Sequence, residues 1–290
     1  IARSSSRCRP ARGWVRLMSA EHRVFGPPGT GKTHYLTDQA AKAGEKYGPE
    51  RVVIASLTKA AASEIGARVV GLPSKNVGTL HALAFRALEF PKLAETADGV
   101  RSWNRHIGDH APALQLTSSV AADPEYAPIE GPTRASEGDE MLAELGARRA
   151  RMEDPEDWPR KVQAFARAWT DWKTKDGLLD FTDLIERAGN EIDAAPGDPR
   201  VLFVDEAQDL SRLEMKLARA WGDATEHFII VGDPDQNLYE WRGSEPDAFT
   251  AVEAASEHVL EQSYRVPAAI HEYAVSWIEK IKDREPVSYR

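Results

Sequence analysis

Short runs of consecutive apolar residues recur along this chain, and most are followed by a stretch with the periodicity of a helix. Residues 201–204 and 228–231 contain only Val, Leu, Ile and Phe, which is typical of strands buried on both faces of a parallel sheet. Similar strand and helix patterns occupy residues 23–25, 34–42, 51–57, 59–65, 77–81 and 82–90. Because strands alternate with helices, the pattern predicts an α/β fold with a parallel sheet and right-handed crossovers.

The pattern changes between residues 91 and 177, where prolines and glycines interrupt a polar stretch before helical periodicity resumes. Helices are predicted at 141–152 and 159–175, and we interpret the region as a helical insertion in the sheet domain. One face of the second helix carries Val162, Phe165, Trp169 and Trp172. This face is either core or a platform for nucleic-acid bases, and we favour core because helical spacing alone indicates nothing more specific.

The composition is that of an ordinary globular protein, with 42% hydrophobic and 29% charged residues among 290. No apolar run approaches the length of a transmembrane helix, and a single cysteine, Cys8, excludes an internal disulfide framework. We therefore expect a cytoplasmic protein without a membrane partner. The net charge of −9 does not indicate a nucleic-acid partner, although a local basic groove with stacking side chains is enough to bind single strands.

Residues 1–18 differ from the rest of the chain, because they are rich in arginine and serine and contain no acidic residue. We expect a disordered leader that takes no part in function, and Met18 followed by Ser19 resembles a natural start. A targeting segment is the alternative, because transit peptides share this composition.

A glycine-rich segment after the first predicted strand fits the phosphate-loop pattern G-x-x-x-x-G-K-[ST]. Its members are Gly26, Pro27, Pro28, Gly29, Thr30, Gly31, Lys32 and Thr33. Glycines let backbone N–H groups turn toward anionic oxygens, Lys32 can reach the β- and γ-phosphates, and the Thr33 hydroxyl can bind Mg²⁺. A chance glycine-rich turn is the alternative, but the strand–loop–helix context favours nucleotide binding.

Acidic and amide side chains follow the two apolar strands predicted at 201–204 and 228–231. Ligands of open parallel sheets sit at the carboxyl ends of the strands, so we expect these side chains at the same edge as the phosphate loop. Asp205 suits Mg²⁺ as a hard oxygen ligand, and Glu206 can orient or deprotonate an attacking water. From the neighbouring strand, Gln236 can sense the γ-phosphate of a nucleotide.

Taken together, these segments resemble the UvrD/Rep-type superfamily 1 DNA helicases. The segments that carry the resemblance are residues 26–33, 57–61, 78–81, 179–184, 204–209, 231–243 and 262–265. A phosphate loop alone is shared by many enzymes, whereas Asp-Gln followed by Tyr-x-Trp-Arg-Gly at 235–243 is much more specific. The order and separation of the segments match the family from Val24 to about Arg265.

The resemblance implies a RecA-like lobe that uses ATP and Mg²⁺. Asp205 and Thr33 would hold the metal, and Glu206 would be the catalytic base. The other implied roles are phosphate contacts for Lys32 and Arg265, coupling of the γ-phosphate to the DNA site for Gln236, and stacking on adenine for Tyr264.

The resemblance also implies single-stranded DNA or a tailed duplex as partner, with Tyr239 and Trp241 facing the strand. Thr58, His81 and Arg242 would line or support the track. An indole is the best platform for a base contact that is independent of sequence, although a buried core position is the alternative for Trp241.

Domain organisation follows from the same resemblance. It implies an ATP-binding lobe at 19–90 and 178–250, a helical insertion at 91–177, and the first elements of a second lobe at 251–290. The later motifs of the family are not found before Arg290, so we expect an N-terminal portion of such a protein. Ser56 stands where members of the family often carry an aromatic residue, and one stacking platform is therefore expected to be missing.

The implied activity is ATP-driven translocation on single-stranded DNA with unwinding of a duplex. One alternative is a nucleotide-gated DNA-binding module without unwinding, and another, disfavoured by Tyr239 and Trp241, is a P-loop kinase or other small-molecule ATPase. For the isolated chain we expect weak or absent unwinding and slow ATP hydrolysis. The reason is that Arg265 would lie on the first strand of a lobe with no sheet left to pair with, and would be poorly positioned.

Trp241→Ala is expected to weaken single-stranded DNA binding by about 5- to 100-fold across sequences, because base–aromatic stacking contributes roughly 1–3 kcal/mol per base. Fluorescence anisotropy with oligonucleotides of unrelated sequence measures the effect. Circular dichroism is the control, since a variant that unfolds shows that Trp241 belongs to the core. Unchanged affinity in a folded variant would remove Trp241 from the DNA track.

Overall fold

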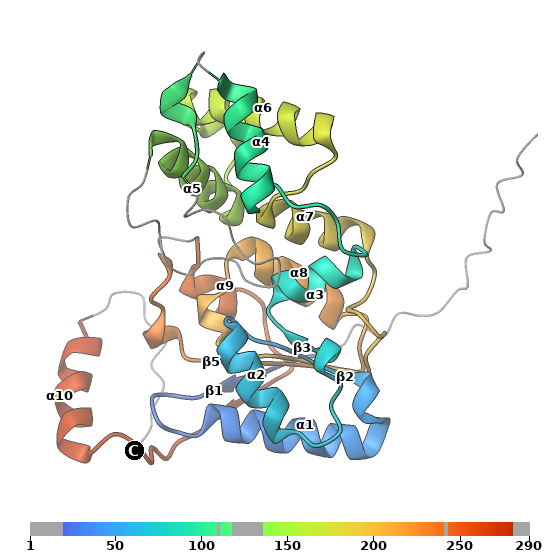
Figure 1. Cartoon of the computed structure of the whole chain (residues 1–290). Coiled ribbons are helices and arrows are strands. Elements are labelled where there is room, and N and C mark those ends of the chain that lie inside the picture. Colours follow the sequence, from blue (N-terminus) through green and yellow to red (C-terminus); the bar gives the residue numbers. More distant parts are fainter. Residues whose placement is uncertain (1–19, 109–110, 118–135, 241–242, 281–290) are drawn as a thin grey trace, which may run out of the picture.

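The computed structural model describes residues 20–108, 111–117, 136–240 and 243–280. Its centre is a six-stranded sheet in the order β3-β2-β4-β5-β1-β6, in which all neighbouring strands run parallel (Figure 1). The strands are β1 (Glu21–Phe25), β2 (Val52–Ala55), β3 (Val77–Gly78), β4 (Val201–Val204), β5 (His227–Gly232) and β6 (Ser256–Val259). The predicted α/β fold with a parallel sheet flanked by helices is therefore confirmed.

Helices cover both faces of the sheet, as expected when parallel strands are joined by helical crossovers (Figure 1). On one face lie α1 (Lys32–Tyr47) and α2 (Lys59–Arg68), whose apolar residues share a core cluster with Ile54 and Phe203. The helices on the other face are α3 (Leu80–Ala87), α7 (Phe181–Glu191), α8 (Arg212–Gly222) and α9 (Pro246–Thr250).

Two elements are shorter than the sequence predicts. The second strand does not extend over 51–57, because Thr58 already caps α2 with its side chain. Helix α3 ends before residue 90, because Glu89 and Phe90 both have a left-handed φ of 59°. Such a backbone conformation cannot continue a right-handed helix.

The last strand departs from the predicted domain organisation. The sequence predicts that residues 251–290 begin a second lobe with no sheet to pair with, but β6 pairs in parallel with β1. Strand β1 has β5 on its other side, so its open edge accepts β6. The expectation of an unpaired strand is therefore wrong for β6, whereas the other domain boundaries stay a prediction. Beyond β6, helix α10 (Ala268–Ile278) stands apart from the sheet (Figure 1).

Helices α4 (Ala97–Ile107), α5 (Glu137–Ala150) and α6 (Arg160–Asp176) gather at one end of the molecule, away from the sheet (Figure 1). They have a hydrophobic cluster of their own, centred on Trp103. The ring of Trp103 packs edge-on against that of Trp169, with centroids 5.0 Å apart. The predicted core role of one face of α6 is confirmed, because its four apolar side chains are each at most 1% exposed: Val162, Phe165, Trp169 and Trp172.

A buried cluster of charges joins these helices to the sheet-bearing part. Asp180 caps α7 and accepts hydrogen bonds from Trp169 Nε1 at 2.9 Å and from Lys173 Nζ at 2.6 Å, both on α6. Arg149 of α5 pairs with the same carboxylate at 3.0 Å and with Asp183 at 2.6 Å. Helix α7 in turn packs against α3 and α8 over the sheet. The cluster therefore fixes the position of the helical region on the sheet-bearing part.

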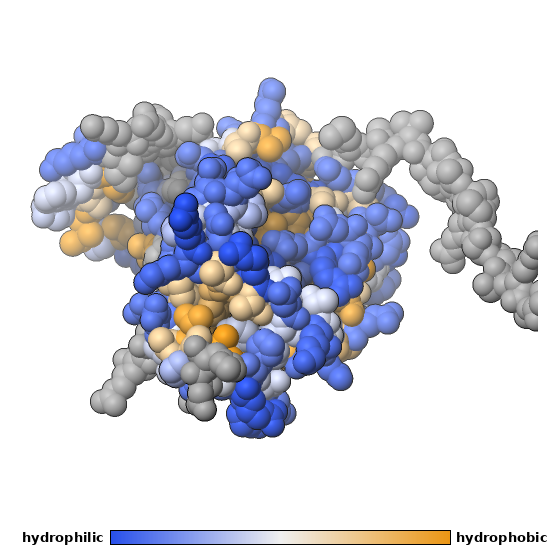
Figure 2. All heavy atoms as spheres, turned by 90° about the horizontal axis from the view of Figure 1, so that it is seen from above, coloured by the Kyte–Doolittle hydropathy of each residue, from blue (hydrophilic) through white to orange (hydrophobic). Residues whose placement is uncertain are grey.

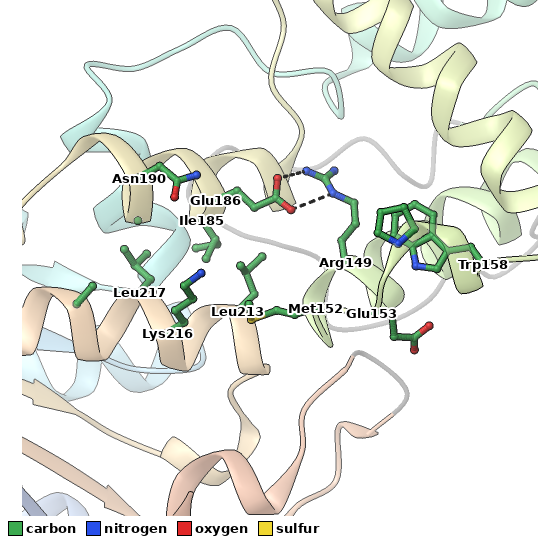
Figure 3. A pocket seen from close by; sticks show the side chains of 13 residues that line it. Arg149, Met152, Glu153, Trp158, Ile185, Glu186, Asn190, Leu213, Lys216 and Leu217 are labelled. Carbon is green, nitrogen blue, oxygen red and sulfur yellow. Dashed lines mark hydrogen bonds and ion pairs between the residues drawn. The ribbon is translucent and has the colours of Figure 1, made fainter. Parts of the chain in front are cut away.

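A cavity of about 360 Å³ lies at the same junction, between the end of α5 and helices α7 and α8 (Figure 3). Met152, Trp158 and Leu213 give it a largely hydrophobic wall, and Arg149 pairs with Glu186 at 2.7 Å on its border. None of the described residues that line it was predicted to bind nucleotide or DNA.

The face shown in Figure 2 is mostly hydrophilic, with hydrophobic residues in smaller patches. On α10, the apolar side chains of Ile270, Tyr273 and Trp277 are each more than half exposed. Within the ranges that the structure describes, no helix combines the length and the apolar character needed to cross a bilayer.

Asp180→Asn is expected to lower the free energy of unfolding by about 3 kcal/mol, because removing one partner leaves the buried charges of Arg149 and Lys173 under-compensated. Asp171→Asn is the matched control, since Asp171 lies on α6 with an exposed side chain and its replacement should change stability by less than about 0.5 kcal/mol. Urea denaturation measures both values. Equal stability of the two variants would show that the charge cluster does not hold the junction.

Candidate active site

The segment between β1 and α1 forms a compact loop held by its own backbone. Thr30 Oγ1 donates to the Pro27 carbonyl at 2.7 Å, and Gly26 N donates to the Gly232 carbonyl at the end of β5 at 2.9 Å. Gly31 caps α1 with a left-handed φ of 84°, a conformation that a side chain would strain. The loop therefore leads directly into the N-terminus of α1, where backbone N–H groups attract anions.

Lys32 crosses this loop. Its Nζ donates to the Gly26 carbonyl at 2.8 Å and lies 3.8 Å from Glu206 Oε2. A Cβ on Gly26 would stand 2.1 Å from Lys32 Cγ, so a glycine is required for the lysine to take this path. The structure thus brings the predicted phosphate-binding lysine beside the predicted base.

Asp205 follows β4 and is 2% exposed. Its Oδ1 has no hydrogen-bond partner among the described residues. Burial, and then the charge of Glu206, raise the pKa of Asp205 to about 7. A nearby cation would stabilise such a carboxylate, since an opposite charge favours the ionised form.

The residues around Asp205 fit Mg²⁺, which typically takes one or two carboxylates and completes its shell with water and phosphates. Thr33 lies in the first turn of α1, next to Lys32. Among the described residues, no group of three or more His, Cys, Asp and Glu side chains forms a metal site from protein alone. Asp205 and Thr33 are thus the side chains that could hold Mg²⁺ together with a nucleotide.

Gln208 links the ends of β4 and β5, although no role was predicted for it from the sequence. Its Nε2 donates to Glu206 Oε2 and to Asp209 Oδ2, both at 3.0 Å, while its Oε1 accepts from Asp233 N at 2.9 Å. Gln236 Nε2 donates to Asp233 Oδ2. The predicted base and the predicted sensor are therefore connected through Gln208. The sequence feature that could have indicated this role is the position of Gln208 within an acidic cluster directly after a predicted strand.

Asp209, also missed, connects this edge to the segment expected to face DNA. Its Oδ1 accepts from Leu238 N at 3.2 Å, and Asn237 Nδ2 donates to the Gln208 carbonyl at 2.5 Å. Burial raises the pKa of Asp209 to about 6. Tyr239 is the next residue of this segment and is half-buried. A continuous set of hydrogen bonds thus links the sheet edge that carries the phosphate loop to the segment predicted to face DNA.

The segment with Tyr264 and Arg265 lies against the phosphate loop. Ser263 Oγ donates to the Pro28 carbonyl and Tyr264 N donates to the Gly29 carbonyl, both at 2.9 Å. A Cβ on Gly29 would lie 2.5 Å from Arg265 Cβ, so the two backbones approach closely. These bonds and β6 anchor the backbone next to Arg265, whereas the poor positioning expected of its side chain stays a prediction. The side chain of Tyr264 is 83% exposed.

Two of the residues predicted to line DNA make contacts inside the protein. Thr58 Oγ1 accepts from Ala61 N at 3.1 Å as the cap of α2. His81 Nδ1 lies 3.4 Å from Glu214 Oε1 of α8. Their role in lining DNA stays a prediction, as does that of two residues outside the described ranges, Trp241 and Arg242.

Ser56 does not occupy a surface position. Its side chain is buried, with 2% exposure, directly after β2. A buried position offers no surface for a base, and the expected loss of a stacking platform stays a prediction.

A groove of about 560 Å³ lies between α2, β3 and α3. Lys59, Lys75 and Arg86 line it, and no acidic side chain of the described residues does. Phe90 also lines the groove and is 66% exposed. A cationic groove with an exposed ring suits a single nucleic-acid strand. Its lining residues lie between residues 59 and 90, and Lys59, Gly78 and Thr79 belong to two of the segments that carry the resemblance.

Comparison with known proteins gives a family. The family model described as the UvrD/REP helicase N-terminal domain matches residues 11–256. The chain is 24% identical to the ATP-dependent DNA helicase PcrA of Bacillus subtilis over 280 residues, which cover 89% of this chain and 37% of the relative. It is 27% identical to DNA helicase II of Escherichia coli, over 90% of this chain and 38% of the relative.

A third relative is the ATP-dependent DNA helicase UvrD2 of Mycobacterium tuberculosis, 28% identical over 83% of this chain and 39% of the relative. The chain thus spans less than two-fifths of the length of these relatives. Since the family model covers most of the sequence and its defining loop and strand ends meet at one sheet edge, this chain belongs to the UvrD/REP helicase family.

Proposed function

We propose that this chain is the ATP-binding portion of a DNA helicase that moves along single-stranded DNA. The observation that carries the proposal is the buried Asp205 carboxylate, unpartnered at Oδ1 and adjacent to Glu206, at the same edge as the phosphate loop. Membership of the UvrD/REP helicase family supports ATP and DNA as ligands. The cytoplasmic location expected from composition stays a prediction.

In this proposal the phosphate loop and the start of α1 bind the phosphates of ATP through backbone N–H groups. Lys32 exchanges its bond to the Gly26 carbonyl for a phosphate oxygen, which moves its positive charge from a neutral partner to an anion. Thr33 and Asp205 would hold Mg²⁺, which would supply neutralisation of the phosphate charge. Glu206, held at one oxygen by Gln208, orients and deprotonates the attacking water.

Coupling to DNA would use the hydrogen bonds that connect the two strand ends. Gln236 contacts Asp233, which is bonded to Gln208, and Gln208 is bonded to Asp209. Asp209 in turn accepts from Leu238, one residue before Tyr239. A change at the γ-phosphate that moves Gln236 would therefore be transmitted through these hydrogen bonds to the segment that we expect to face DNA.

For the DNA itself we propose a single strand or the single-stranded tail of a duplex. Tyr239 and Trp241 would stack on bases, with Thr58, His81 and Arg242 beside them. The cationic groove with Lys59, Lys75 and Arg86 adjoins Thr58 and His81 in the chain and supplies charge for the phosphates. Such a groove reconciles a net charge of −9 with a polyanionic partner.

ATP turnover measured with and without single-stranded DNA tests the proposal. A translocase is stimulated by the strand, and this is the expected result for a preparation that folds and binds nucleotide. DNA binding that depends on nucleotide, without stimulated turnover, would favour the nucleotide-gated module instead. ATP turnover that is the same with and without DNA would favour a small-molecule ATPase and refute the proposed helicase activity.

Lys32→Ala is expected to weaken binding of Mg·ATP by about 10- to 100-fold, because a hydrogen bond to a charged group contributes roughly 1.5–3 kcal/mol. Lys42→Ala is the matched control on the same helix, since Lys42 pairs with exposed Asp38 at 2.7 Å and should not affect affinity. Titration calorimetry gives both constants. Equal affinities for the two variants would contradict the assignment of the phosphate loop.

A further inference from the structure

Ser56 carries a buried hydroxyl for which the described part of the fold provides no use. The residue is 2% exposed, and its Oγ has no hydrogen-bond partner among the described residues. Burying a hydroxyl without a partner destabilises a fold, and an alanine of nearly the same size would avoid this cost. A bound partner outside the described residues would remove this cost.

The register of the sheet places Ser56 beside Asp205. Strands β2 and β4 run parallel with Ala55 opposite Val204, and Asp205 N donates to the Ala55 carbonyl at 2.8 Å. Ser56 N donates to the Gly78 carbonyl at 3.0 Å, so the extended pairing continues one residue beyond β2. Side chains at equivalent positions of neighbouring strands leave the sheet on the same face. Ser56 and Asp205 are such a pair.

That face is the one covered by α1 and α2. Two residues earlier on the same strands, Ile54 and Phe203 belong to the core cluster that contains Leu36 of α1. Since side chains alternate between faces, the next positions on this face are Ser56 and Asp205. They therefore lie under the helix whose first turn holds Lys32 and Thr33.

Each of these two neighbouring positions thus carries a buried oxygen atom without a hydrogen-bond partner among the described residues, Ser56 Oγ and Asp205 Oδ1. We propose that Ser56 is a positioning residue of the Mg²⁺ site, an inference that rests on the proposed function. Its hydroxyl completes, with Asp205 and Thr33, the set of oxygens around the hydrated cation of the nucleotide complex. Mg²⁺ keeps several waters when it binds, and these waters need acceptors such as a serine hydroxyl.

The experiment compares wild type with Ser56→Ala, using Mn²⁺ as probe in the presence of ADP and electron paramagnetic resonance to count free metal. We expect metal affinity to fall about 10- to 100-fold in Ser56→Ala, the range typical of residues that support metal ligands. Affinity for ADP in EDTA should stay the same. The thermal midpoint of the metal-free protein should be unchanged or higher, because an unsatisfied buried hydroxyl has been removed.

Two further variants make the comparison specific. Ser56→Thr keeps the hydroxyl and should retain metal affinity within a few-fold. Thr225→Ala removes a buried hydroxyl that is already bonded to the Gly222 carbonyl at 2.7 Å, so it should lower the thermal midpoint and leave metal affinity unchanged. This opposite pattern separates a structural hydroxyl from a metal-positioning one.

Equal Mn²⁺ affinity in wild type and Ser56→Ala would overturn this inference and leave the proposed function standing. A lower thermal midpoint of metal-free Ser56→Ala would also overturn it, because the hydroxyl would then serve the fold. If wild type with ADP binds no Mn²⁺ at all, the proposed function fails first and this inference with it.

Discussion

Parallel pairing of β2, β4, β5 and β1 is the constraint on which the rest of the structure depends. It ends four strands at one edge, and hydrogen bonds continue the pairing past the strands, from Gly26 N to the Gly232 carbonyl and from Asp205 N to the Ala55 carbonyl. These bonds bring the phosphate loop and the two acidic strand ends together. Close approach is part of the same constraint, because a Cβ on Gly232 would stand 2.6 Å from Gln208 Oε1.

Carboxylates in this protein are buried under two different electrostatic regimes. At the junction of the helical region, burial opposes ionisation of Asp180, but the charges of Arg149 and Lys173 prevail and hold its pKa well below the usual range. At the sheet edge, burial and the charge of Glu206 instead raise the pKa of Asp205 to about 7. The first carboxylate is satisfied by protein cations and holds structure together. The second lacks such compensation, which is the condition expected of a carboxylate that binds a metal ion.

Sequence patterns predicted those parts of the protein whose physics is local. Continuous apolar runs identified β4 at its observed bounds, and glycine spacing identified the loop that positions Lys32. Helical spacing correctly favoured a core role for the tryptophan face of α6. Asp205 and Glu206 were found because a pair of acids directly after a buried strand is costly without a ligand.

What the sequence by itself determined, then, was the fold class, the phosphate loop and the acids that face it, since each depends on neighbours in the chain. Only the tertiary structure decided the pairing of β6, a strand of Ser, Glu, His and Val that has no apolar run to mark it. The same is true of Gln208, Asp209 and Ser56, whose roles depend on partners on other strands and segments. A hydrogen bond or a shared face between distant segments leaves no periodicity in either segment, so it becomes visible only when the strands are aligned.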